Sequence, residues 1–226
     1  SSALASSLYE IQLQHDPVAL RHAYIQLQLG TDRTAEALSH EILHLSIRMQ
    51  GYPIGEAVCV PEELDRYAGH VLGIHHVVGN LVEHEIISDA FVAMGFEKER
   101  FLRPIQPAPD YRDLASMARP SLGYVEEVGF SWWRLEYFRN RISGRHWLGS
   151  KAHANAEMAL HWGSQVHSDI PQTASQIRGL IESGCLLDRE EHSRHFNRLL
   201  GLMRLPAFTE WVTIQPGDDT LVVIRL

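Results

Sequence analysis

The chain has 226 residues, a formal net charge of −8 and a hydrophobic fraction of 45%, the composition of an ordinary soluble globular protein. No apolar run reaches the roughly 18 residues that a membrane-spanning helix needs, which excludes an integral membrane protein. The two cysteines, Cys59 and Cys185, are too few for a disulfide-stapled scaffold or a cysteine-rich zinc module. Such sparse cysteine predicts a cytoplasmic location, unless a signal peptide has been removed ahead of Ser1.

Acidic residues and histidines are concentrated in the first part of the chain. Residues 1–95 hold 12 Asp or Glu against 4 Arg, a net charge of −8, whereas residues 96–226 hold 16 of each sign. The first part also carries 8 of the 14 histidines. Because phosphate binding needs a positively charged surface, this balance argues against nucleic acid as a partner. Carboxylates clustered with imidazoles instead indicate a site for a cation.

The chain is expected to begin with two strands and a helix. Apolar and polar residues alternate over 8–14 and again over 23–29, which predicts two strands that are candidates to pair. Apolar residues then recur at helical spacing over 33–50, until a Gly and a Pro end the pattern. Residues 51–61 are expected to form a loop.

The middle of the chain is expected to contain a second clear helix and a long loop. Gly69, Gly73 and Gly79 are expected to interrupt a short helical stretch, after which residues 80–94 form the helix. The proline-rich residues 103–123 predict an extended loop. This loop is the candidate boundary between two lobes of one domain that spans the whole chain.

The last part of the chain is expected to be mainly helical and to finish with strands. Four further helices are predicted near 131–143, 152–166, 172–183 and 189–203. Asp188 is the expected N-cap of the last one, and Glu191 is placed to complete a capping box. Strands at 209–215 and 220–226 flank the turn-forming residues 216–219 and predict a terminal hairpin. With strands at both ends and helices between them, the predicted class is α+β.

The first predicted helix carries the pattern HExxH, as His40-Glu41-Ile42-Leu43-His44. Because positions i and i+4 lie on one face of a helix, His40 and His44 can bind the same metal ion. Glu41 follows the first ligand and is the candidate general base that accepts a proton from a metal-bound water. Chance alone produces the pattern in about 7 of 100 sequences of this composition, so the alternative is a helix whose histidines bind no metal.

The second clear helix offers candidates for a third ligand. A catalytic zinc site needs three protein ligands and one open position for water. Glu85 and Asp89 lie one turn apart, so Glu85 could complete a His-His-Glu set while Asp89 holds the second nitrogen of a ligated histidine. His84 points about 100° away from Glu85 and is the alternative third ligand. The pair His75-His76, in the glycine-broken stretch, is a further possibility.

These motifs resemble those of a known family of enzymes. His40-Glu41-x-x-His44 followed by Glu85-x-x-Ser88-Asp89 resembles the gluzincin zinc metallopeptidases, and the ExxSD segment is similar to that of thermolysin-like enzymes. The resemblance implies one zinc ion (Zn²⁺) per chain, bound by His40, His44 and Glu85, with Glu41 as general base and Asp89 as partner of a zinc-bound histidine. It also implies a zincin-like fold, in which an edge strand lies beside the active-site helix, and residues 23–29 are the candidate strand.

The sequence therefore predicts a zinc metallopeptidase, a hydrolase that acts on a peptide or protein substrate. Such an enzyme also needs a hydrogen-bond donor for the oxyanion that develops at the scissile carbonyl. The choice stays open among His146, His153, His161, His167 and Tyr124. The alternative function is a zincin-like module that binds metal as a regulator or sensor without turnover. The general base favours the enzyme, because a purely structural zinc site closes its fourth position with protein.

Overall fold

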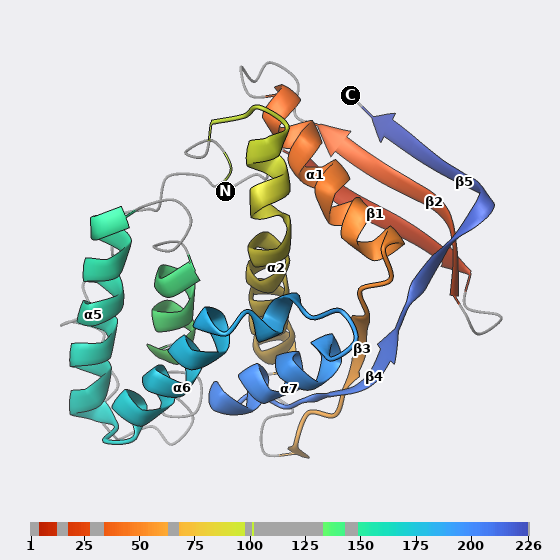
Figure 1. Ribbon diagram of the computed structural model, residues 1–226. Coiled ribbons are helices and arrows are strands. Elements are labelled where there is room, and N and C mark those ends of the chain that lie inside the picture. Colours follow the sequence, from red (N-terminus) through yellow and green to blue (C-terminus); the bar gives the residue numbers. More distant parts are fainter. Residues whose placement is uncertain are drawn as a thin grey trace.

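The computed structural model describes residues 5–12, 18–27, 34–62, 68–97, 101, 133–142 and 149–225. Helices and strands in these ranges form an α+β fold, which confirms the predicted class (Figure 1). Within them, no helix combines the length and the apolar character that crossing a bilayer requires. The predicted loop at 103–123, with its candidate lobe boundary, lies outside the described residues.

A three-stranded sheet brings together the first and the last described strands. β1 (Ala5–Gln12) pairs antiparallel with β2 (Val18–Leu27), which confirms the predicted strand pair. β2 also pairs in parallel with β5 (Ile214–Arg225), so the strand order is β1-β2-β5. Because β2 is the central strand, the prediction that residues 23–29 form an edge strand is wrong.

The prediction of a terminal hairpin is also wrong. Residues 216–219, which were expected to form its turn, lie within the strand β5. Along the ladder, β2 advances two residues from Leu20 to His22 while β5 advances five from Pro216 to Leu221. The residues with turn-forming chemistry therefore make an irregular bulge in one continuous strand, in place of a turn between two strands. β4 (Phe208–Val212) pairs with β3 (Ile54–Val58), a strand within the segment predicted to be a loop.

Two helices carry the sequence motifs. α1 (Thr34–Met49) matches the predicted helix and contacts all three strands of the larger sheet (Figure 1). α2 (Ala68–Ala93) is one continuous helix of 26 residues, so the expected interruption at its glycines is wrong. A Cβ built on Gly69 or Gly73 meets no atom within 4 Å, so these glycines face open space on a helix whose other residues sustain it.

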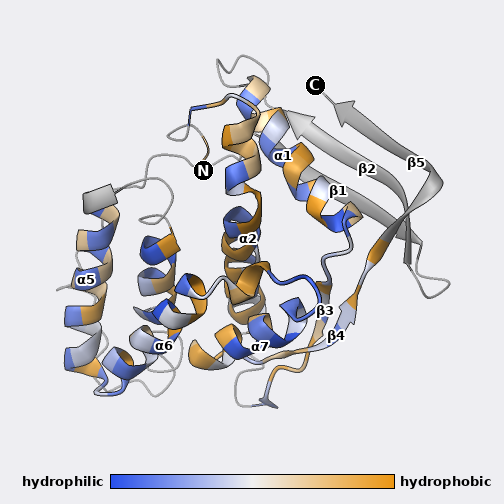
Figure 2. Cartoon of the chain, viewed as in Figure 1, coloured by the Kyte–Doolittle hydropathy of each residue, from blue (hydrophilic) through white to orange (hydrophobic). Residues whose placement is uncertain are grey.

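The remaining helices lie beside and below α2 in Figure 1. They are residues 133–142, α5 (Gly149–Val166), α6 (Ile170–Glu182), the 3₁₀ turn η4 (Cys185–Leu187) and α7 (His192–Leu202), which confirm the four helices predicted there. Their apolar side chains form the largest core cluster with Val78, Leu81 and Val82 of α2. Figure 2 shows hydrophobic residues over much of α2, as expected for a helix with neighbours on more than one side.

The start of α7 differs from its prediction. Glu191 is the residue before the first turn of this helix, and it makes no side-chain capping bond. The Oδ1 atom of Asp188 accepts hydrogen bonds from the backbone N–H groups of Glu190 and Glu191 at 3.0 and 3.3 Å. Asp188 therefore caps the short turn before the helix, and the predicted capping box does not form.

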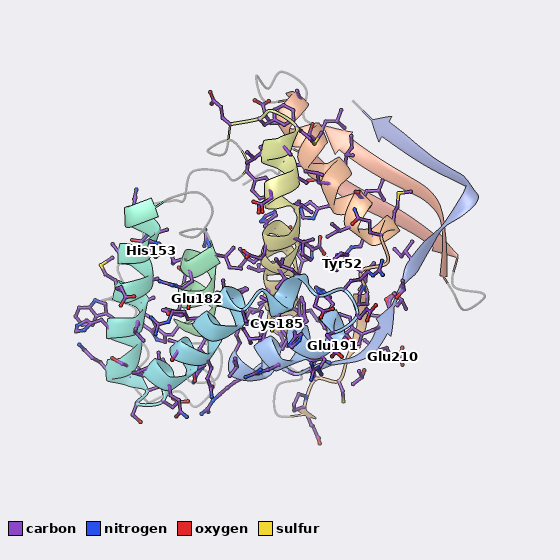
Figure 3. The ribbon with its side chains drawn as sticks, viewed as in Figure 1. Tyr52, His153, Glu182, Cys185, Glu191 and Glu210 are labelled. Carbon is purple, nitrogen blue, oxygen red and sulfur yellow. The ribbon has the colours of Figure 1, made fainter. Side chains whose placement is uncertain are left out.

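The end of α1 is tied to the helical side of the molecule by Tyr52, which is labelled in Figure 3. The Tyr52 hydroxyl donates a 2.8 Å hydrogen bond to the carbonyl of Leu187. The Arg189 guanidinium donates to the carbonyl of Gln50 at 3.0 Å. These bonds fix the last turn of α1 relative to η4.

Candidate metal centre

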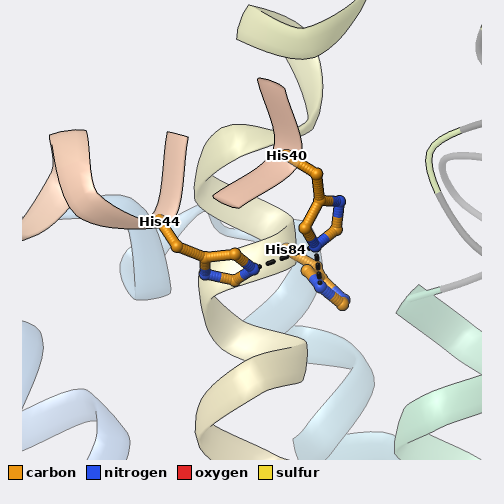
Figure 4. A group of neighbouring side chains, drawn as sticks. All are labelled: His40, His44 and His84. Carbon is orange, nitrogen blue, oxygen red and sulfur yellow. Dashed lines mark hydrogen bonds between the residues drawn. The ribbon is translucent and has the colours of Figure 1, made fainter. Parts of the chain in front are cut away.

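Three histidines from two helices converge in the structure (Figure 4). His40 and His44 lie one turn apart on α1, and His84 faces them from α2. The Nε2 atom of His40 is 3.0 Å from Nε2 of His44 and 3.0 Å from Nε2 of His84. Among the described residues, these three form the one group of His, Cys, Asp or Glu side chains that could share a metal ion. We refer to them as the histidine triad.

Apolar packing between the two helices turns His84 toward α1. His84, Ile87 and Phe91 follow one another at helical spacing on α2, and all three are buried. Ile87 and Phe91 form a small core with Ile47 of α1 and with Phe101. The Phe101 ring also lies against the triad, with its centroid 4.7 Å from that of His40 and 5.2 Å from that of His84.

Hydrogen bonding alone does not account for the triad. A neutral imidazole nitrogen either donates or accepts, so Nε2 of His40 cannot make a well-aligned hydrogen bond with both partner nitrogens. Two nitrogens bound to one tetrahedral zinc ion at 2.0–2.1 Å lie about 3.3 Å apart. The observed 3.0 Å separations differ from that value by a few tenths of an ångström. All three ligand atoms lie within 4.8 Å of one another, which is close enough for the triad to bind one metal ion.

The histidine triad is uncharged at neutral pH. Burial and, to a smaller extent, the neighbouring His44 lower the pKa of His40 to about 3, an effect that a hydrogen bond to the backbone of Phe101 opposes. Burial also lowers the pKa of His44 to about 4, an effect that the Glu41 carboxylate opposes and Arg48 reinforces. For His84, burial and then the two other rings hold the pKa well below 6.5. Neutral imidazole is the form that binds a metal ion, so no proton has to leave first.

Two of the three rings have hydrogen-bond partners outside the triad. The Nδ1 atom of His44 lies 2.6 Å from Oε2 of Glu83, and Glu83 is ion-paired with Arg48. His40 has a hydrogen bond to the backbone of Phe101. The Nδ1 atom of His84 is buried without a hydrogen-bond partner among the described residues. A buried polar atom of this kind costs free energy, so this nitrogen does not itself stabilise the fold.

The predicted site residues are only partly brought together. His40 and His44 are joined by His84, the alternative third ligand, whereas Glu85 is not part of the triad. Since neighbours on a helix point about 100° apart, the packing that turns His84 toward α1 turns Glu85 away from it. Glu85 is buried and Asp89 is exposed, and Glu83 occupies the place beside a histidine nitrogen that Asp89 was expected to take.

The other histidines considered for the site lie elsewhere or have structural partners. Both ring nitrogens of His75 lie 2.7 Å from backbone carbonyls, those of Val71 and Pro206, and His76 is exposed. His153, labelled in Figure 3, contacts Arg141. His161 is exposed beside Gln165, and His167 is half-buried. His146 and Tyr124 lie outside the described residues.

Glu83 and Arg48 are the residues of this centre that the sequence motifs did not reveal. Arg48 lies one turn beyond His44 on α1, and Glu83 directly precedes His84. These two sequence positions were the only features from which their place beside the histidines could have been predicted. Comparisons of the chain with protein-family models, with curated proteins and with solved structures found no match.

Proposed function

We propose that this protein is a zinc-dependent hydrolase of peptide bonds, with His40, His44 and His84 as the metal ligands and Glu41 as the general base. The observation that carries the proposal is the convergence of three neutral imidazole nitrogens beside the glutamate of an HExxH helix. The ligand set differs from the His-His-Glu set that the gluzincin resemblance implies, because His84 replaces Glu85.

The number of ligands supports a catalytic role over a structural one. Three protein ligands leave one coordination position open, whereas structural zinc sites use four protein ligands. When bound in such a site, zinc supplies a Lewis acid that lowers the pKa of a coordinated water from about 15.7 to about 7. The described part of the chain provides the three histidines and no fourth member of their group.

The surroundings of Glu41 support its role as the general base. It is half-buried, follows His40 on α1 and lies close enough to His44 for its carboxylate to raise the pKa of that ring. A carboxylate in this position accepts a proton from the attacking water and passes it to the leaving amine. Glu41 therefore acts as base and then as acid, while the histidines hold the metal.

The arrangement of α1 and α2 supports a zincin-like interpretation of the fold. The HExxH helix packs on a mixed sheet, and the third ligand comes from the next helix along the chain. In this interpretation an extended substrate would pair with a sheet edge, β1 or β5, and not with β2.

Metal content tests the ligand set. We expect about one zinc ion per wild-type chain, loss of zinc in His44→Ala and His84→Ala, and retention of zinc in Glu85→Ala, measured by mass spectrometry on purified protein. Circular dichroism checks that each variant is folded. Loss in Glu85→Ala with retention in His84→Ala would restore the His-His-Glu set. Failure of the wild-type protein to bind zinc when zinc is supplied would contradict the proposal.

Turnover tests the role of Glu41. Wild-type protein loaded with zinc should cleave members of a peptide library, and Glu41→Gln should lower the rate by about 100-fold or more while zinc stays bound. Cleavage products are identified by mass spectrometry. Equal rates in the two proteins would contradict the mechanism. A zinc-bound wild type that cleaves no peptide would favour the regulatory or sensor module instead.

A further inference from the structure

A chain of three polar side chains leads away from the histidine triad. Nδ1 of His44 faces Oε2 of Glu83 at 2.6 Å, while Nε2 of the same ring faces His40. The other carboxylate oxygen of Glu83 is ion-paired with Arg48. His44 and Arg48 lie one turn apart on α1, so Glu83 of α2 bridges two residues on the same face of that helix.

Stability alone does not explain why these groups are buried. The side chains of His44, Glu83 and Arg48 are 8%, 15% and 12% exposed. Removing a carboxylate and a guanidinium from water costs free energy that their attraction repays only partly, so apolar residues of similar size would stabilise the helix contact at least as well. The arrangement of these charges therefore points to a use at the site.

That use follows from the single proton on a neutral imidazole. If the proton is on Nδ1, it is donated to Glu83, and the lone pair on Nε2 faces the other two histidines. If the proton is on Nε2, the N–H group points into the triad and no lone pair is available there. A carboxylate beside Nδ1 stabilises the first tautomer and holds the plane of the ring.

We propose that Glu83 is the positioning residue of the centre, which fixes the tautomer and orientation of His44, and that Arg48 holds the Glu83 carboxylate in place. The role rests on the proposed function, because a fixed Nε2 lone pair matters only if His44 is a ligand. It replaces the role that the sequence assigned to Asp89. Glu83 acts through His44 and is not itself a ligand or a base.

The first experiment examines the tautomer in metal-free protein at neutral pH. Long-range ¹H–¹⁵N NMR spectra should show His44 protonated at Nδ1 in the wild type and shifted toward the Nε2-protonated form in Glu83→Ala. Glu83→Gln should keep the Nδ1 proton, because the amide oxygen still accepts it. Since no metal is needed, this result is independent of whether the protein binds zinc or cleaves peptides.

The second experiment measures zinc affinity by competition with a chelator. Glu83→Ala should weaken binding by about 10- to 100-fold, and Glu83→Gln should weaken it less. Arg48→Ala should weaken binding in the wild-type background but add little to Glu83→Ala, because Arg48 acts through Glu83. Glu182→Ala, which breaks the 3.2 Å ion pair with Arg141 between two other helices, is the control and should leave the affinity unchanged.

Two results would overturn the proposal. One is a His44 tautomer that is the same in Glu83→Ala and the wild type. The other is zinc affinity in folded Glu83→Ala within about twofold of that in Glu182→Ala, which would leave the pair as a contact between helices only. If Glu83→Ala does not fold, the zinc affinity alone is compared, with Glu83→Gln in its place, and that affinity must then fall below the affinity of the control. Failure of the wild type to bind zinc would instead remove the proposed function.

Discussion

At the scale of single residues, burial sets the charge of the three histidines, and their charge links folding to pH. The pKa of His40 falls from 6.5 to about 3 and that of His44 to about 4 when the protein folds, and that of His84 also falls. Between the folded and unfolded pKa values, the unfolded chain binds protons that the folded protein does not. Stability contributed by these groups is complete above pH 6.5 and is lost as the pH falls toward 4.

Metal-free protein should therefore lose stability on mild acidification. Between about pH 6.5 and pH 4, each histidine of the triad should lower the free energy of unfolding by up to about 1.4 kcal/mol per pH unit. Urea unfolding at a series of pH values measures this slope. His84→Leu should reduce the slope. A slope that is unchanged in His84→Leu would contradict the assignment of a lowered pKa to His84.

The sequence predicted two members of the triad but favoured Glu85 over His84 as the third ligand, for a reason that lies in α2. The spacing of apolar residues shows which face of a helix is buried when one face is apolar and the other is polar. Only then does it indicate which side chain on the helix can reach a neighbouring site. α2 has buried residues on two sides, because it packs against α1 and also against the other helices. Ile87 and Phe91 lie on the side toward α1, and Val78, Val82 and Glu85 lie on another. The contact of Ile87 and Phe91 with Ile47 is what selects His84, and this contact is made in tertiary structure.

At the scale of elements, α2 shows that glycines inside a helix do not have to break it. The sequence predicted interruptions because Gly lowers helix propensity by up to about 1 kcal/mol relative to Ala. The packing of the other residues of α2 outweighs that cost over 26 residues. Local propensity could predict the end of the helix near Gly95, because the φ of 92° at this residue favours glycine. It could not predict where the helix begins.

Two glycine substitutions should have opposite effects on stability. Gly73→Ala places a methyl group in open space on α2 and should raise the free energy of unfolding by about 0.5–1 kcal/mol. Gly163→Ala on α5 places it 3.0 Å from Cδ1 of Ile170 and 3.3 Å from Cγ of Trp133, and should lower the free energy by about 1–3 kcal/mol. Chemical denaturation of both variants measures the difference. Equal effects would mean that the packing around one of these glycines is not as described.

At the scale of the whole molecule, the histidine triad joins the helix that lies on the larger sheet to the helix that packs with the rest of the core. His40 and His44 belong to α1, and His84 belongs to α2. A ligand that binds only the folded protein stabilises it by about 4 kcal/mol at a thousand times its dissociation constant. Zinc should therefore stabilise the contact between both parts of the protein.

Zinc in such excess should raise the melting temperature by about 10 °C, since 1 kcal/mol corresponds to about 2–4 °C for a chain of this size. Differential scanning calorimetry with and without zinc measures the shift. His84→Ala should abolish it, and Asp89→Asn, an exposed change on the same helix, should leave it intact. An equal shift in His84→Ala would mean that zinc stabilises the protein through another site.

The larger sheet was the part of the fold that the sequence predicted least well. The pairing of β1 with β2 is local and follows from alternating residues, whereas the pairing of β2 with β5 joins segments at opposite ends of the described chain. The residues Pro216-Gly217 favour a turn by local chemistry, but a parallel ladder with β2 on both sides of the bulge keeps the strand continuous. Local patterns cannot predict which distant strand a segment will join.

The parallel ladder between β2 and β5 also sets the order of events during synthesis. Residues of β2 leave the ribosome early, but the strand that completes their sheet, β5, extends to Arg225. Until those residues emerge, α1 has only part of the surface on which it packs, so the helix that carries His40 and His44 lacks its full support. A nascent chain therefore cannot assemble the histidine triad on its final framework before translation has passed β5, so the centre matures only after β5 has emerged.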